Sequence, residues 1–156
     1  MGGGSGVDAI YTGTIGCERD RGFKMEKKKI LIVDDDEAVV RILSINLAME
    51  GFEVYTAFDG MSAVMSAHKI LPDLIILDVR MPAGDGFSVV ERLRTSTKTF
   101  TIPILFLSAL PKEDIEEKAL QAGVSQCFAK PFDPMALIGC INGLLGIRKE
   151  QVVANM

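Results

Sequence analysis

The sequence has no apolar stretch near the roughly 20 residues that a membrane-spanning helix needs. Its start also lacks a basic segment followed by an apolar one, so we expect neither a membrane segment nor a secretory signal peptide. Cysteine is scarce, because only Cys17, Cys127 and Cys140 occur. They lack the spacing of metal ligands, and three cysteines cannot all pair with one another. We therefore expect reduced thiols and a cytoplasmic protein.

Positive charge is also in short supply. The formal net charge is −4, and the one basic run is Lys27, Lys28 and Lys29. A protein that binds a nucleic-acid duplex needs a basic stripe to neutralise phosphates, so we expect no nucleic-acid binding by this domain. The chain has 156 residues, of which 48% are hydrophobic and 24% charged. This length and balance suit one globular domain with its own core.

The first part of the chain has no periodic pattern. Residues 2–6 read GGGSG, which is typical of a linker, and glycine, threonine and charged residues then mix up to about Lys24. We assign residues 1–25 to a disordered or added extension. Residues 26–147 form the expected folded domain, and residues 148–156 are a short C-terminal tail.

From Lys29 onward, short apolar runs alternate with longer stretches of helical period. Asp59 and Asp133 are expected to cap the second and fifth helices, while Gly51 and Gly123 are expected to follow helix ends. Strands that alternate with helices predict an α/β fold, a doubly wound five-stranded parallel sheet with helices on both faces. The expected strands are Ile30–Val33, Glu53–Ala57, Leu74–Asp78, Ile102–Leu107 and Ser125–Ala129.

Polar residues follow or end four of these strands, at the edge where such sheets bind ligands. They are Asp34 and Asp35, Asp78, Ser108 and Lys130. Converging carboxylates repel one another, and Mg²⁺, which prefers oxygen ligands, would relieve that repulsion. A hydroxyl and an ammonium can contact phosphate oxygens, and a carboxylate can act as a nucleophile by forming an acyl phosphate. The set therefore predicts a phosphoryl-transfer site.

Each of these residues also has a simpler interpretation on its own. Asp34 to Asp36 could be a helix N-cap followed by two first-turn acids. Asp78 could cap a turn, Ser108 could be a loop hydroxyl and Lys130 a surface lysine. We favour a shared site, because five accidents would have to fall on one edge of one sheet. Asp36 alone is interpreted as a first-turn acid.

The motifs VDDDEA, LDVRMPAGDG, LSA and AKPF, in this order, resemble the receiver domain of bacterial response regulators over roughly residues 28–147. The resemblance implies the flavodoxin-like fold, with strand order 2-1-3-4-5 and a cis bond before Pro131. It implies Asp78 as the phosphoacceptor, with Ser108 and Lys130 beside the phosphoryl group. The implied Mg²⁺ site comprises the acids Asp34, Asp35 and Asp78 and the backbone carbonyl of Arg80.

By this resemblance the protein receives a phosphoryl group from a sensor histidine kinase or a histidine phosphotransfer protein. It is a signalling phosphoacceptor that catalyses its own phosphorylation and dephosphorylation, rather than an enzyme. The fourth helix, fifth strand and fifth helix would then switch toward a downstream protein target, and a phosphorylation-dependent homodimer stays open. The expected fourth helix turns only Ile115, Ala119 and Ala122 inward, which suits an element that shifts.

One residue departs from the family pattern. Cys127 stands where receivers commonly carry a tyrosine or phenylalanine ring that moves inward on activation. Phe128 is adjacent, but successive strand residues point to opposite faces, so its ring is expected in the core. This predicts weaker coupling between phosphorylation of Asp78 and the output face.

Two other functions are weighed against the receiver. A binding module that does not use the chemistry is favoured only by Cys127. A haloacid-dehalogenase-like phosphatase would need its nucleophile after the first strand, with a threonine or valine four residues later. Ala38 stands at that position after Asp34, so the motif is incomplete.

Overall fold

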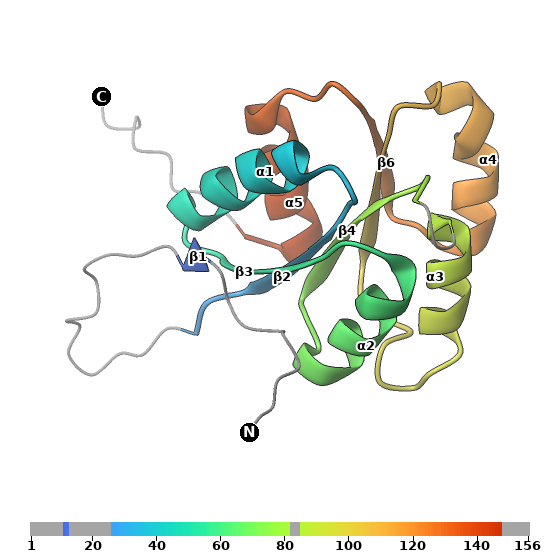
Figure 1. The fold of residues 1–156 in the computed structure, drawn as a ribbon, viewed down its shortest axis with the longest axis horizontal. Helices are drawn as coiled ribbons and strands as arrows, with labels where there is room; N and C mark the ends of the chain where they lie inside the picture. Colours follow the sequence, from blue (N-terminus) through green and yellow to red (C-terminus); the bar gives the residue numbers. More distant parts are fainter. Residues whose placement is uncertain (1–10, 13–25, 82–84, 148–156) are drawn as a thin grey trace.

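The computed structural model describes residues 11–12, 26–81 and 85–147 (Figure 1). The remainder of the predicted extension, residues 1–10 and 13–25, and the predicted tail, residues 148–156, lie outside the described residues. Among the described residues, no helix combines the length and the apolar character needed to cross a bilayer.

One six-stranded sheet, in the order β1-β3-β2-β4-β5-β6, forms the centre of the domain. Counted from β2, the five parallel strands have the order 2-1-3-4-5, which confirms the fold predicted from the sequence. The strands are β1 (Tyr11–Thr12), β2 (Lys29–Val33), β3 (Glu53–Ala57), β4 (Leu74–Asp78), β5 (Ile104–Ser108) and β6 (Gln126–Ala129).

Three strand starts differ from the prediction. β2 begins at Lys29, one residue before the predicted start. β5 begins at Ile104 and not at Ile102, because Pro103 has no backbone N–H to donate to a neighbouring strand. Its carbonyl still accepts a hydrogen bond from the amide of Ile75 at 3.0 Å. β6 begins at Gln126, one residue after the predicted start.

β1 was not predicted, because the pattern indicated no regular element before Lys29. Its two residues pair antiparallel with Val54 and Glu53 at the free edge of β3. A strand this short has too few residues to show a period of two. Within the segment that the sequence assigns to a disordered or added extension, Tyr11–Thr12 thus form a strand.

The five helices of the described residues cover the two faces of the sheet (Figure 1). Helices α1 (Glu37–Met49) and α5 (Pro134–Leu145) lie on one face, and α2 (Gly60–Ile70), α3 (Gly86–Arg94) and α4 (Lys112–Ala122) on the other. Successive residues of β2 pack into different cores. Ile30 and Ile32 belong to the core under α1 and α5, and Leu31 and Val33 belong to the core on the side of α2. β4 and β5 are buried at every position.

The predicted helix boundaries are confirmed where they depend on caps. Asp59 accepts a hydrogen bond from the amide of Ser62 at 2.8 Å, and Asp133 caps α5 with Pro134 in the first turn. Gly123 ends α4 with φ of 86°, a left-handed conformation that favours glycine. These boundaries fix where each strand and helix meets the loops that carry the site.

Candidate functional site

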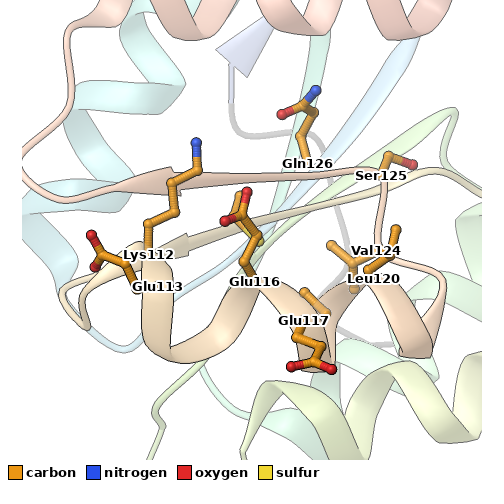
Figure 2. Close-up of a pocket in the computed structure, with 10 residues that line it drawn as sticks. Lys112, Glu113, Glu116, Glu117, Leu120, Val124, Ser125 and Gln126 are labelled. Atoms are coloured by element: carbon orange, nitrogen blue, oxygen red, sulfur yellow. The ribbon is translucent and has the colours of Figure 1, made fainter.

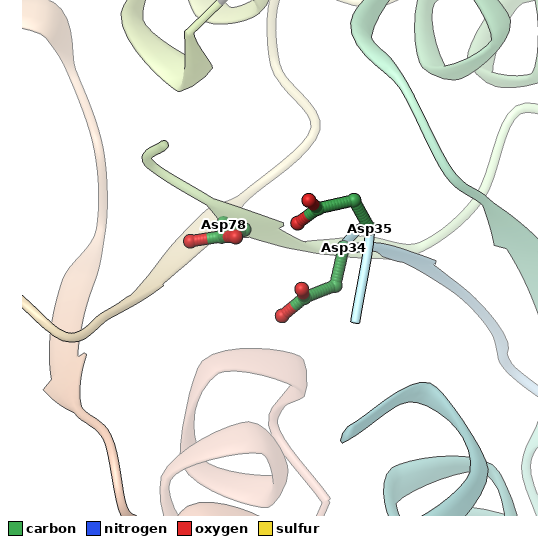
Figure 3. A group of neighbouring side chains, drawn as sticks. All are labelled: Asp34, Asp35 and Asp78. Atoms are coloured by element: carbon green, nitrogen blue, oxygen red, sulfur yellow. The ribbon is translucent and has the colours of Figure 1, made fainter. Parts of the chain in front are cut away.

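Three carboxylates meet at the carboxyl edge of the sheet (Figure 3). Asp34 and Asp35 follow β2 directly, and Asp78 is the last residue of the adjacent strand β4. One oxygen from each lies within 4.8 Å of the others. Asp34 and Asp78 are 1% and 5% exposed, whereas Asp35 is open to solvent. Two of the three charges are thus held away from water, which strengthens their repulsion.

Lys130 supplies a positive charge to this cluster from the end of β6. Its Nζ lies 2.9 Å from Asp34 Oδ2 and 3.6 Å from Asp78 Oδ2. Burial alone would lower the pKa of Lys130, but the two carboxylates outweigh burial and raise it. The bond from Lys130 to Pro131 is cis, as the resemblance implied.

The pKa of Asp78 is raised to about 6, mainly by burial and then by the charge of Asp34. The ammonium of Lys130 and the backbone amide of Arg80 act in the opposite direction. The Arg80 amide donates to Asp78 Oδ1 at 3.3 Å, while the Arg80 side chain is exposed. Asp78 is therefore a carboxyl whose proton affinity depends on the charges around it.

Ser108 ends β5, the strand next to Asp78, and is 1% exposed. Its Oγ accepts a hydrogen bond from the amide of Leu110 at 2.9 Å. A hydroxyl that accepts in this way still has its own proton to donate. The structure thus brings all the predicted site residues to one edge of the sheet, although their roles stay predictions.

Asp36 has a different role from the one predicted. It is the N-cap of α1, because its carboxylate accepts from the amide of Ala38 at 3.0 Å, and the first-turn acid is Glu37. The Asp36 amide in turn donates to Asp34 Oδ1 at 2.9 Å. Since Asp36 provides the cap, the interpretation of Asp34 and Asp35 as capping or first-turn acids is wrong.

Gly86, at the start of α3, lies against the backbone of the site. A Cβ on Gly86 would lie 2.8 Å from the carbonyl oxygen of Asp78 and 3.0 Å from Cα of Val79. The Gly86 amide also donates to the Val79 carbonyl at 2.7 Å, and Asp85 caps α3 by accepting from the amide of Ser88 at 3.0 Å. The start of α3 therefore packs directly against the backbone that carries Asp78.

The carboxylate cluster fits a hard divalent cation. Asp34 Oδ2 is buried, and the contact given for it is the Lys130 ammonium at 2.9 Å. Oxygen donors of this kind, with one carboxylate facing solvent, suit Mg²⁺ and its bound waters. The residues present are thus compatible with the metal that the resemblance implied.

Cys127, which departs from the family pattern, and its neighbour Phe128 face opposite cores. Cys127 belongs to the core under α4, and Phe128 packs against the core under α1 and α5. Burial raises the pKa of the Cys127 thiol. In α4 only Ile115 and Ala119 are fully buried, and Ala122 is partly buried, so this helix is seated by few apolar side chains.

Comparison with known proteins places these residues in a family. Residues 30–142 match the family described as response regulator receiver domain. The chain is 39% identical over 117 residues to the DNA-binding dual master transcriptional regulator RpaA of Synechocystis, covering 75% of this chain and 48% of RpaA. It is 40% identical over 116 residues to the response regulator PleD of Caulobacter vibrioides, covering 74% of this chain and 26% of PleD. The chain thus spans about half or less of these relatives.

Solved structures show the same fold over nearly all of the described residues. A chemotaxis protein of Vibrio cholerae, CheY4, superposes with a TM-score of 0.73 at 32% identity, covering 77% of this chain and 100% of that one. A response regulator from Chloroflexus aurantiacus gives 0.74 at 36% identity, covering 78% of this chain and 99% of that one.

Proposed function

The chain belongs to the response regulator receiver domain family, and from that premise we propose that Asp78 accepts a phosphoryl group from phosphohistidine. The donor is a sensor histidine kinase or a histidine phosphotransfer protein. The observation that supports this most directly is the meeting of Asp78, Asp34, Asp35 and Lys130 at one edge of the sheet. Because the chain belongs to the receiver family, we set aside the phosphatase alternative, in which the nucleophile would be the aspartate after β2.

In the proposed reaction a carboxylate oxygen of Asp78 attacks phosphorus in line with the donor's imidazole nitrogen. The P–N bond breaks, a P–O bond forms, and the imidazole leaves with the bond's electron pair. Lys130 lies 3.6 Å from Asp78 Oδ2, where its ammonium can offset charge on the transferring oxygens. The protein's contribution is position and charge, and no separate substrate is turned over.

We propose Mg²⁺ as the cofactor, held by Asp34, Asp35, Asp78 and the backbone carbonyl of Arg80. When bound, Mg²⁺ supplies positive charge to the carboxylates and the phosphoryl oxygens. The oxygens of Asp34, Asp35 and Asp78, which lie within 4.8 Å of one another, support this assignment.

Ser108 is the proposed residue that responds to the new group. Its Oγ now accepts from Leu110, and its proton can be donated to a phosphoryl oxygen. A shift of β5 toward Asp78 would change the packing of α4, which few buried side chains hold. The α4, β6 and α5 face would then present a different surface to a downstream protein target or to a second copy.

We also propose residues 26–147 as the functional unit and the cytoplasm as its location. The second proposal is supported by the free thiols of Cys127 and Cys140. Because the chain spans only part of its relatives, their outputs do not transfer to it. The alternative, a module that binds partners without phosphorylation, is favoured only by Cys127.

Intact mass after incubation with a small phosphodonor tests the proposal. With Mg²⁺ we expect the gain of one phosphoryl group, and with EDTA no gain. Asp78→Asn should show none in either condition, whereas Asp36→Ser, which keeps a capping hydroxyl, should behave like the wild type. No gain in the wild type with Mg²⁺ would instead support the binding module.

A further inference from the structure

A groove of about 610 Å³ separates helix α4 from the outer edge of β6 (Figure 2). β6 pairs with β5 alone among the described strands, so its other edge borders this groove. Its apolar lining residues include Leu120, Val124 and Cys127. Leu120 is 75% exposed and Cys127 8%. The groove thus offers a place for an apolar side chain.

The rim of the groove is acidic. Glu113, Glu116 and Glu117 line it from α4, against the one cation Lys112 among the lining residues. The other cation of α4 is engaged elsewhere, since the Lys118 ammonium lies 5.0 Å from the ring centroid of Phe87 on α3. The rim therefore has an excess of two negative charges, in a chain whose net charge is already −4.

From this charge and shape we propose that the groove binds a basic, amphipathic segment of a partner protein. One apolar side chain of the partner enters over Cys127 beside Leu120, and its lysine or arginine side chains pair with Glu113, Glu116 and Glu117. This inference rests on the proposed function and deepens it, because it gives the chemistry of the partner on the responding face.

A second copy of the chain is a poorer occupant of the same groove. Two copies paired about a two-fold axis would bring the same patch together, so two acidic rims would lie in one interface and repel each other. Nucleic acids and anionic lipid surfaces are repelled for the same reason. A basic amphipathic segment offers positive charge to the glutamates and an apolar side chain to Leu120, Val124 and Cys127.

The test is an amide-shift NMR titration with a short synthetic peptide that has lysines on one helical face and a single phenylalanine. Mg²⁺ is present to neutralise the Asp78 cluster, and no phosphodonor is added, so that the result is independent of Asp78 chemistry. We expect shifts confined to α4 and β6. A peptide with glutamates in place of the lysines, or serine in place of the phenylalanine, should bind weakly or not at all.

Variants separate this groove from the general acidity of the protein. Glu113→Gln with Glu116→Gln should weaken binding by about 3- to 10-fold, from the loss of two exposed ion pairs. The matched control, Glu26→Gln with Glu91→Gln, changes exposed glutamates outside the groove. It should leave the binding of the peptide unchanged. Leu120→Ser should also weaken binding, and since that side chain is largely exposed the fold should be unchanged.

Three results would overturn the proposal: shifts outside α4 and β6, equal loss in the matched control, or equal binding of the acidic peptide. Self-association in sedimentation that Glu113→Gln with Glu116→Gln abolishes would make the occupant a second copy and would also overturn it. Failure of the phosphodonor experiment with an intact titration would leave the groove established and remove only the proposed phosphorylation.

Discussion

Lys130 Nζ is closer to Asp34, at 2.9 Å, than to Asp78, at 3.6 Å. The proposed phosphoacceptor thus shares its counter-charge with a second buried carboxylate. Without Lys130, two buried acids would face each other uncompensated.

Lys130→Met should therefore destabilise the metal-free protein at neutral pH. We expect a loss of up to about 3 kcal/mol in the free energy of unfolding, the lower end for breaking a buried pair, because 18% of the Lys130 side chain is exposed. Urea unfolding in EDTA measures it. Adding Asp34→Asn removes the repulsion and should recover part of the loss; an unchanged free energy in Lys130→Met would show that the ion pair contributes nothing.

The raised pKa of Asp78 predicts a specific pH dependence of stability. A carboxyl whose pKa rises from 3.8 to about 6 on folding binds its proton more tightly in the folded state. The stability that this gives is fully present below about pH 3.8 and is lost as the pH rises through about 6. Through Asp78, the free energy of unfolding of the metal-free wild type should fall by about 1–3 kcal/mol across this window. Asp78→Asn should show no such fall.

The measurement compares urea unfolding of the two proteins in EDTA at about pH 4 and about pH 7.5. Other titrating groups are common to both proteins and cancel in the difference. The advantage of Asp78→Asn should grow with pH. A difference that is constant or shrinks with pH would contradict the raised pKa.

Mg²⁺ should stabilise the folded protein, because only the folded chain brings the three carboxylates together. At free Mg²⁺ about ten times its Kd the gain is about 1.4 kcal/mol, which thermal melting detects as a higher Tm. Asp34→Asn and Asp35→Asn should reduce the gain. Asp36→Ser is the matched control, since it removes an adjacent acid but keeps a capping oxygen; an equal loss there would contradict the assigned ligands.

Gly86→Ala should be destabilising, because its Cβ would lie 2.8 Å from the Asp78 carbonyl oxygen, a backbone atom that cannot turn away. We expect a loss of about 1–3 kcal/mol and slower phosphorylation. Gly139→Ala is the control within α5, where a Cβ meets nothing within 4 Å. That change should be neutral or stabilise by up to about 1 kcal/mol. Equal effects of the two substitutions would remove the steric role of Gly86.

Sequence patterns gave the five parallel strands and the composition of the site because both depend on local residue types. Buried strands are continuous apolar runs, and polar residues at their ends are conspicuous. The pattern did not decide which of three consecutive aspartates caps α1. That depends on where β2 stops pairing, and the Asp34 amide still donates to the Ala57 carbonyl at 3.2 Å. The cap therefore falls on Asp36.

Other features depend on contacts between remote segments, which no local pattern contains. The close approach of Gly86 to Asp78 joins a helix start to a strand end. The preference of Lys130 for Asp34 is a difference of less than 1 Å between two distances. The groove beside Cys127 depends on how far α4 lies from β6. None of these three features could be predicted from the sequence, because each depends on the three-dimensional arrangement of the chain.

Cys127 predicts weak coupling between the site and α4, since a small side chain stands where relatives commonly carry a ring. Cys127→Tyr should increase the amide shifts that a phosphodonor with Mg²⁺ induces in α4, because residue 127 shares a core with Ile115 and Ala119 of this helix and a ring there would transmit a shift of Ser108. Cys127→Ala should resemble the wild type. The ring could cost about 1–3 kcal/mol through overpacking, so unfolding is measured in parallel. If Cys127→Tyr is folded and takes up phosphate, yet its α4 shifts equal those of wild type, the coupling does not depend on this position.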